Sequence, residues 1–170
     1  MKRIIATGGA AVLTLTLCVA TAAAKADFGG AWFLDKAHSE GLPPGMDQTM
    51  TVTLAGDNLS LETRVTTEQG EQTVSDSYVL DGKAAEFTPR APAGVTGRGT
   101  RTAKWTADGN GIEVKEEATL KTPEGEVSVK AERRWTLSPD GKTLKIELTI
   151  EDPGETHRSS RTFTRKLNGQ

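Results

Sequence analysis

Six charged side chains fall in phase with apolar residues in alternating stretches of this sequence, and together they could bind a charged ligand. Each lies two positions from a Val, Ala, Trp, Tyr or Phe on the same face of an expected strand. They are Asp76, Arg101, Glu116, Arg133, Arg161 and Arg165. Burying an unpaired charge costs several kcal/mol, whereas a whole domain is stable by only about 5–15 kcal/mol. Six unpaired charges therefore cannot be sealed inside a core.

Three arrangements would avoid this cost, and the sequence leaves all three open. The charges could pair with one another, as Glu116 with Arg133, or Asp76 with a different arginine, Arg101. They could lie at strand ends, where water reaches them. The interior could also be wet and accept a polar, anionic ligand. In addition, a one-residue bulge would turn a charge to the outer face.

The wet interior leads to the functional hypothesis, which is a binding protein for a small amphipathic or anionic ligand. Arginine donates paired N–H groups that suit a carboxylate or phosphate, and aromatic rings supply the apolar walls of small-molecule pockets. The ligand-binding residues predicted on this basis are Arg101, Arg133, Trp105, Trp135, Tyr78 and Glu116. The hypothesis needs no cofactor.

The sequence offers little for catalysis or metal binding, so no enzyme activity, catalytic residue or metal site is predicted. The only histidines are His38 and His157. His38 precedes Ser39 and Glu40, but adjacent residues in a loop do not form a catalytic triad by themselves. Two isolated histidines and a single cysteine do not give the ligand spacing of a metal site.

Turn residues recur along the chain and divide it into the short strands that must position these side chains. Turn sequences such as Asp81-Gly82 and Pro139-Asp140-Gly141 place Gly and Asp where positive φ is needed, and Pro where a turn begins. Between these turns the chain is rich in Thr and Val and alternates with period two, which is typical of strands in hairpins. The predicted strands are 30–34, 48–55, 59–68, 72–80, 84–88, 100–107, 112–121, 126–138, 143–151 and 156–167.

Strands joined mostly by tight turns predict an all-β fold, an antiparallel up-and-down meander. Left open, a meander exposes two unpaired edges, and closure or near closure into a barrel of about 8–10 strands removes them. A two-sheet sandwich usually needs long cross-over connections, which this chain lacks. A transmembrane barrel needs aromatic girdles, whereas aromatic residues make up only 5% of the chain.

The first predicted strand carries Gly30-Ala31-Trp32, which resembles the G-x-W signature of lipocalins and the wider calycin superfamily. The resemblance to lipocalin-like proteins exported by bacteria extends over residues 32–39 and the hairpin at 135–144. In that group the tryptophan packs against an arginine of the last strand, so the resemblance implies structural roles for Gly30, Trp32 and Arg165. It implies a ligand-binding barrel, but it carries over neither a ligand nor a catalytic residue.

The N-terminus has the pattern of a secretory signal peptide. Lys2 and Arg3 precede an apolar stretch, and Ala24-Lys25-Ala26 has small residues at the two positions that signal peptidase recognises. Residues 1–26 are therefore predicted to be a cleaved signal peptide, and residues 27–170 a single lipocalin-like domain. We expect an exported protein, periplasmic or secreted, that is not inserted in a membrane after cleavage.

Charge and loop composition bear on the partner. The chain has 21 Lys and Arg against 23 Asp and Glu, which argues against a nucleic-acid partner because such binding needs a basic face. Two stretches lack alternation, residues 35–47 and 89–99. The alternative function is therefore a protein-binding or inhibitor module that acts through these two loops on an unknown protein partner.

Overall fold

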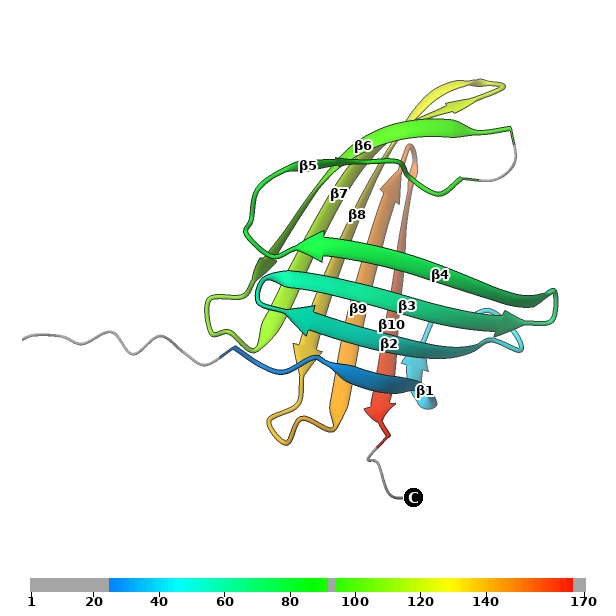
Figure 1. The fold of residues 1–170 in the computed structure, drawn as a ribbon. Coiled ribbons are helices and arrows are strands. Elements are labelled where there is room, and N and C mark those ends of the chain that lie inside the picture. Colours follow the sequence, from blue (N-terminus) through cyan, green and yellow to red (C-terminus); the bar gives the residue numbers. More distant parts are fainter. Residues whose placement is uncertain (1–24, 92–93, 167–170) are drawn as a thin grey trace, which may run out of the picture.

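Ten antiparallel strands follow one another along the chain and form one sheet (Figure 1). The structure, a computed structural model, describes residues 25–91 and 94–166, so only Lys25 and Ala26 of the expected signal peptide are among the described residues. The strands are β1 (Gly30–Glu40), β2 (Asp47–Ala55), β3 (Asn58–Thr67), β4 (Gly70–Val79), β5 (Ala85–Phe87), β6 (Thr96–Trp105), β7 (Gly111–Thr122), β8 (Gly125–Leu137), β9 (Thr143–Asp152) and β10 (Glu155–Arg165). The predicted all-β meander is confirmed.

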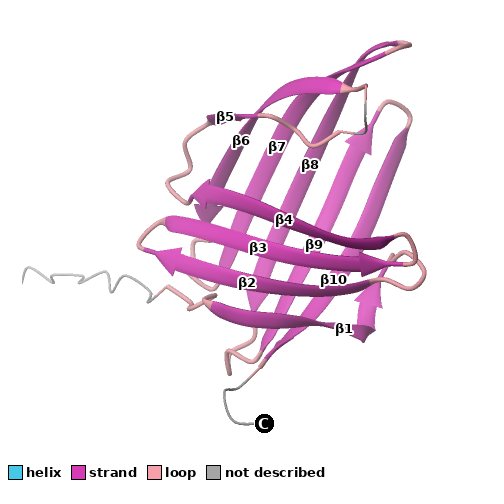
Figure 2. Cartoon of the chain, turned by 45° about the vertical axis from the view of Figure 1, so that its right-hand side comes forward, coloured by secondary structure: helices cyan, strands magenta, loops and turns pink. Residues whose placement is uncertain are grey.

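The sheet curls strongly into a half-barrel (Figure 2). Each strand pairs with the next along the chain, except that β4 and β5 do not pair and β1 pairs with β10. The resulting order is β4-β3-β2-β1-β10-β9-β8-β7-β6-β5. No part of the described chain forms a helix that could cross a bilayer.

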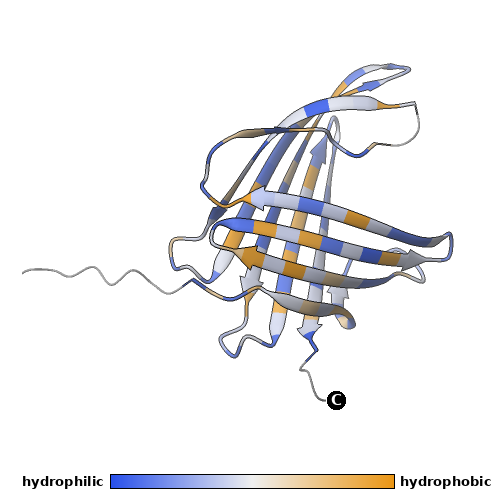
Figure 3. Cartoon of the chain, viewed as in Figure 1, coloured by the Kyte–Doolittle hydropathy of each residue, from blue (hydrophilic) through white to orange (hydrophobic). Residues whose placement is uncertain are grey.

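Side chains alternate between the inner and outer faces of the curled sheet, because successive residues of a strand point to opposite sides. Figure 3 shows hydrophilic and hydrophobic residues in alternation along β2 and β3. On β2, Gln48, Met50 and Val52 are buried, whereas Thr51 and Thr53 are exposed. The inner face therefore forms the core.

Strand β1 is longer than the predicted 30–34, because residues 35–40 continue it past an irregularity in its pairing with β10. The hydroxyl of Ser39 donates to the carbonyl oxygen of Asp35 at 2.6 Å and accepts from the amide of Thr162 at 2.9 Å. These bonds replace the regular ladder at the irregularity. The stretch without a strand is thus 41–46, which contains the prolines and glycines.

Strand β6 begins at Thr96, earlier than the predicted residue 100, so two glycines assigned to a loop are strand residues. A Cβ atom at Gly99 would lie 2.6 Å from the carbonyl oxygen of Glu117 and 2.7 Å from the ring of Phe87. Glycine is needed there because another side chain and backbone approach closely, not because the chain turns.

One end of the half-barrel, which we call the floor, is sealed by apolar side chains. Those with no exposed surface there are Phe28, Trp32, Leu59, Ile112 and Leu144. The indole N–H of Trp32 donates to the carbonyl oxygen of Phe28 at 2.9 Å. The guanidinium carbon of Arg165 lies 4.6 Å from the centre of the Trp32 ring. The first and last strands are thereby joined beneath the core, where Trp32 pairs with Arg165 in the ladder.

The half-barrel is unpaired along one side, between β4 and β5, and we call this side the seam. Near the floor the seam is closed by backbone contacts: Asp81 bridges to Lys104, and the amide of Gly82 donates to the carbonyl oxygen of Ala103 at 2.9 Å. Farther from the floor, β4 has no neighbouring strand on this side within the described residues. Side chains span the seam there.

Candidate ligand-binding site

The inner face is sealed at the floor and accessible toward the opposite end, which we call the mouth. On β9, Leu144 near the floor is fully buried, whereas Leu148 and Ile150 nearer the mouth are half-buried. On β3, Leu59 is fully buried and Val65 is half-buried. Inward-facing apolar side chains that remain uncovered are suited to the apolar part of a ligand.

A cavity of about 240 Å³ lies between β2–β4 on one side and β8–β10 on the other. This volume corresponds to roughly eight water molecules at ~30 Å³ each, and it is smaller than the about 300–1,000 Å³ of sites for drug-sized ligands. Its apolar wall includes Met50, Val65, Val74, Ile146, Leu148 and Phe163. The cavity fits a small ligand or one end of a longer molecule.

A buried carboxylate, Glu116 on β7, compensates two arginines beside the cavity. Its Oε2 accepts a hydrogen bond of 2.6 Å from Nη1 of Arg133, and its Oε1 lies 3.7 Å from Nη1 of Arg101. The Glu116 side chain is only 11% exposed. The pKa of Arg133 is raised: burial is the largest single effect and acts to lower it, but the charge and hydrogen bond of Glu116 together with the charges of Tyr78 and Asp76 outweigh burial. Arg101 and Arg133 therefore already have a common anionic partner.

Arg161 on β10 lines the cavity without such a partner. Its Nη1 donates to the side-chain oxygen of Gln48 at 3.0 Å, and its buried Nε has no hydrogen-bond partner. Within the described residues no carboxylate lies at ion-pair distance from it. Burial and the neighbouring charge of Arg133 lower the pKa of Arg161. Arg161 is thus an uncompensated cation at the wall of the cavity.

Two aromatic residues of the cavity carry polar groups. The indole N–H of Trp135 is buried and has no hydrogen-bond partner, although buried donors are normally satisfied. Tyr78 packs against the guanidinium of Arg101, whose central carbon lies 4.8 Å from the ring centre. Burial raises the pKa of Tyr78 to about 12. The unpartnered groups of the cavity wall, those of Arg161 and Trp135, are thus hydrogen-bond donors.

The titration of Tyr78 gives a direct check of how deeply this side chain is buried. It is the only tyrosine of the chain, so phenolate absorbance reports on it alone, and we expect a midpoint near pH 12. The unfolded chain loses its phenol proton first, at a pKa of about 10, so stability should fall by about 2 kcal/mol between pH 10 and 12. The Tyr78→Phe variant has no phenol to ionise, so it should not show this loss of stability between pH 10 and 12. A phenolate midpoint near 10 would contradict the buried placement.

The structure places three of the residues predicted to bind ligand, Tyr78, Arg133 and Trp135, on the cavity wall. Arg101 and Glu116 lie behind it and connect to the wall through Arg133.

Trp105 lies apart from these residues. Its ring centre is 5.8 Å from that of Phe28 at the floor, and its N–H donates to a carboxylate oxygen of Asp57 at 3.3 Å. Alternation predicts that a residue faces the interior, but it does not predict whether the residue lies at the floor or beside the cavity.

Gln48 and Arg90 are among the cavity residues that were not predicted to bind ligand. The spacing of Gln48 from Met50 and Val52 carries the signal, since the three residues share the inner face of β2. Arg90 lies in a stretch without alternation, and no local pattern indicates where its side chain goes. Arg161, noted on the apolar face but not assigned to the site, turns out to line the cavity.

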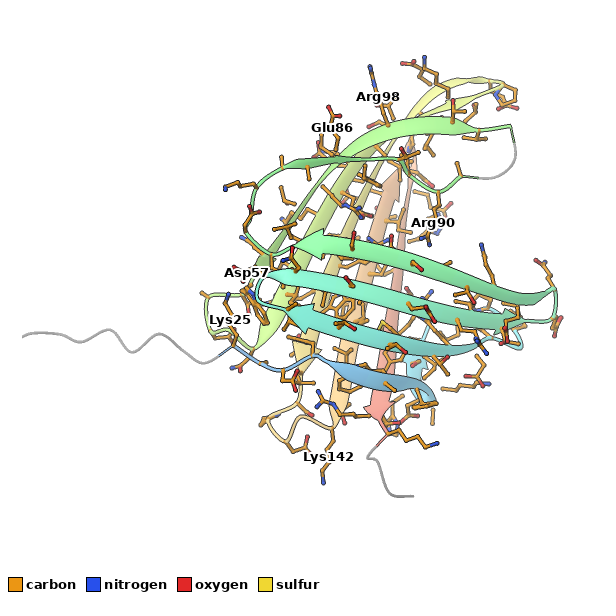
Figure 4. All side chains as sticks on the ribbon, viewed as in Figure 1. Lys25, Asp57, Glu86, Arg90, Arg98 and Lys142 are labelled. Atoms are coloured by element: carbon orange, nitrogen blue, oxygen red, sulfur yellow. The ribbon has the colours of Figure 1, made fainter. Side chains whose placement is uncertain are left out.

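Two arginines span the seam beside the cavity. Arg101 lies between rings from both sides, 4.8 Å from the centre of Tyr78 on β4 and 5.0 Å from that of Phe87 on β5. Arg90 donates to the carbonyl oxygen of Ser75 on β4, and its Nη2 lies 3.6 Å from a carboxylate oxygen of Asp76. Figure 4 shows Arg90 between β4 and the connection that follows β5. Asp76 therefore pairs with Arg90, while Arg101 pairs with Glu116.

The site is chemically suited to binding an acceptor-rich group. Its unpartnered groups are donors on Arg161 and Trp135, and its apolar wall continues toward the mouth. Across residues 25–91 and 94–166, no three His, Cys, Asp or Glu side chains gather as they would around a metal ion.

Comparisons with known proteins identify the fold. No protein family matches this chain by sequence profile, and no curated protein matches it in sequence. Among solved structures, the zebrafish ileal bile acid-binding protein, crystallised with cholic acid, superposes with a TM-score of 0.50 at 14% identity, over 82% of this chain and 98% of that one. The likeness shows that the two chains share a β-barrel fold.

Two further structures superpose less well. Rv2717c from M. tuberculosis matches with a TM-score of 0.47 at 16% identity, over 82% of this chain and 92% of that one. Secretory abundant heat soluble protein 4 from Ramazzottius varieornatus matches with a TM-score of 0.44 at 13% identity, over 82% and 94%.

Proposed function

We propose that this chain is an exported, non-enzymatic binding protein that holds a small amphipathic anion inside its half-barrel. The observation that carries the proposal is the uncompensated Arg161 on the wall of an apolar cavity. Arg161 is half-buried, and an uncompensated charge that is partly removed from water opposes folding, so a function that needs the charge accounts for its presence. An anionic ligand would supply the missing partner.

The ligand would be oriented by the distribution of polar and apolar groups. Its anionic head would accept hydrogen bonds from Arg161 and from the indole N–H of Trp135. Arg133 would add a second positive charge, although Glu116 already neutralises part of it. The apolar part would extend toward the mouth, along half-buried side chains such as Leu148 and Val65.

The fold and the N-terminal sequence support two other parts of the proposal. The zebrafish protein with the same architecture is a bile acid-binding protein with cholic acid in its crystal structure, which supports a binding role in general and not a particular ligand. Export rests on the signal-peptide pattern that begins with Lys2 and Arg3. The site of action would be the periplasm or the outside of the cell.

A displacement experiment with matched ligands tests the proposal. Anilinonaphthalene sulfonate, a fluorescent amphipathic anion, should bind the purified protein in a one-to-one complex, and octanoate should displace it. Octanol has the same chain without the charge, and it should displace the probe at least about 10-fold less well, because a charge-assisted hydrogen bond contributes about 1.5–3 kcal/mol.

Two outcomes would count against the interior site. Equal displacement by octanoate and octanol would show that the arginines do not hold the ligand. Failure of the probe to bind, together with a stoichiometric protein partner recovered from a periplasmic extract, would favour the alternative function through the segments 35–47 and 89–99.

Arg90 is expected to control how fast a ligand enters, because it spans the seam beside the cavity. Arg90→Ala removes its contacts with Ser75 and Asp76. An exposed ion pair contributes about 0.2–1 kcal/mol, so the association rate of anilinonaphthalene sulfonate should rise about 2–5-fold in stopped-flow measurements. Arg98→Ala is the control, since this exposed arginine of β6 removes the same charge without touching the seam. Equal rates in both variants would mean that ligands enter elsewhere.

A further inference from the structure

Lys25 and Ala26, the first residues that the structure describes, are built into the floor. Lys25 Nζ lies 2.5 Å from a carboxylate oxygen of Asp57 and 5.2 Å from the ring centre of Trp105. Figure 4 shows Lys25 and Asp57 next to each other at the edge of the sheet. The amide of Ala26 donates to the carbonyl oxygen of Gly109 in the β6–β7 turn at 2.9 Å. Both residues are therefore part of the folded domain.

The next residues continue the same segment under the core. Phe28 is fully buried, with its ring 5.8 Å from Trp105 and 6.2 Å from Trp135. Arg165 of the last strand donates to the carbonyl oxygen of Asp27 at 2.5 Å. Ala26 is partly buried and packs against this core. The contacts run without a break from Lys25 to Phe28, and no boundary falls after Ala26.

The sequence around this segment offers three Ala-x-Ala sites that signal peptidase could cut. The enzyme requires small residues one and three positions before the cut. The alanine pairs at 20 and 22, at 22 and 24, and at 24 and 26 meet this requirement for cuts after Ala22, Ala24 and Ala26. The sequence pattern fits all three sites, whereas a cut after Ala26 is the one that removes Lys25 and Ala26 from the mature protein.

We infer that the leader is removed before Lys25, after Ala22 or Ala24, so that Lys25 and Ala26 remain in the mature protein. This inference rests on the proposed export. Signal peptidase would hydrolyse the peptide bond after that alanine with water, which leaves a carboxylate on the alanine and an α-ammonium group on the residue that follows. The N-terminal segment of the mature protein would thus be the last piece of the floor, with Lys25 paired to Asp57.

Intact mass and N-terminal sequencing of the protein purified from the periplasm of a Gram-negative host test this site. The full chain with its leader is expressed, and the expected product begins at Ala23 or Lys25 and so retains Lys25 and Ala26. A product that begins at Asp27 would overturn the inference and leave export intact. A product that retains residue 1 and stays out of the periplasm would overturn export itself, together with the inference that depends on it.

A stability comparison tests whether Lys25 and Ala26 matter to the fold. Chains that begin at Lys25 and at Asp27 are prepared by tag removal, and the shorter chain should have a Tm about 3–6 °C lower. Asp57→Asn should lower the Tm of the longer chain by about 1–2 °C and that of the shorter chain by less, because the shorter chain has no Lys25 and the asparagine oxygen can still accept from the indole N–H of Trp105. Identical Tm values for the two chains would overturn the structural basis of the inference.

Discussion

Replacement of Arg161 by glutamine is expected to weaken the binding of octanoate about 10–100-fold and to leave the binding of octanol nearly unchanged. Glutamine keeps a hydrogen-bonding side chain beside Gln48 but removes the one cavity charge that has no carboxylate partner. A hydrogen bond to a charged group contributes about 1.5–3 kcal/mol, which corresponds to this loss of affinity. Competition with anilinonaphthalene sulfonate measures both ligands under the same conditions.

The stability of the Arg161→Gln variant separates a role in binding from a role in folding. Because an uncompensated charge that is partly removed from water opposes folding, removal of the half-buried Arg161 charge should leave the free energy of unfolding unchanged or increase it. The matched control is Arg158→Gln, an exposed arginine of the same strand that should affect neither measurement. A variant that binds octanoate as well as the parent, or that loses both binding and stability, would contradict the assignment of Arg161.

Replacement of Glu116 by glutamine is expected to lower the free energy of unfolding by about 3–4 kcal/mol. The substitution leaves Arg101 and Arg133 without the carboxylate that compensates them, and removal of one partner of a buried ion pair costs about 3–5 kcal/mol. Urea unfolding monitored by tryptophan fluorescence measures the loss. The value lies toward the lower end of that range because the two arginine side chains are 20% and 30% exposed.

The same Glu116→Gln variant should bind anions more tightly, so the substitution lowers stability but raises the affinity for anions. With Glu116 neutral, Arg133 is no longer partly neutralised, and the affinity for octanoate should rise about 3–10-fold. Glu117→Gln is the control, because its ion pair with Lys130 lies on the exposed outer face and is worth at most about 1 kcal/mol. Equal losses of stability in the two variants would show that Glu116 is not the central counter-ion.

The strands could be predicted from the sequence because hairpin turns and period-two alternation are local signals. The same alternation placed Glu116 and Arg133 on one face of neighbouring strands, and the ladder pairs Glu116 with Ala131 and Val114 with Arg133. The two charges are therefore diagonal neighbours, within reach of each other. Their ion pair was one of the arrangements that the sequence left open.

Other features depend on how distant parts of the sheet meet, and no local pattern indicates them. Alternation assigned Trp105 to the inner face, but the curl of the sheet places it at the floor against Phe28. Arg90 reaches Asp76 only because the half-barrel brings the β5–β6 connection beside β4. Both placements follow from the curl of the sheet.

The most direct test of the proposed function is a crystal structure of the mature protein with octanoate. We expect the carboxylate within about 3 Å of the Arg161 guanidinium, with one oxygen near the indole nitrogen of Trp135. The alkyl chain should extend past Leu148 toward the mouth. An octanoate bound on the outer face, or one bound in the cavity with its carboxylate turned toward the mouth and away from Arg161, would contradict the account.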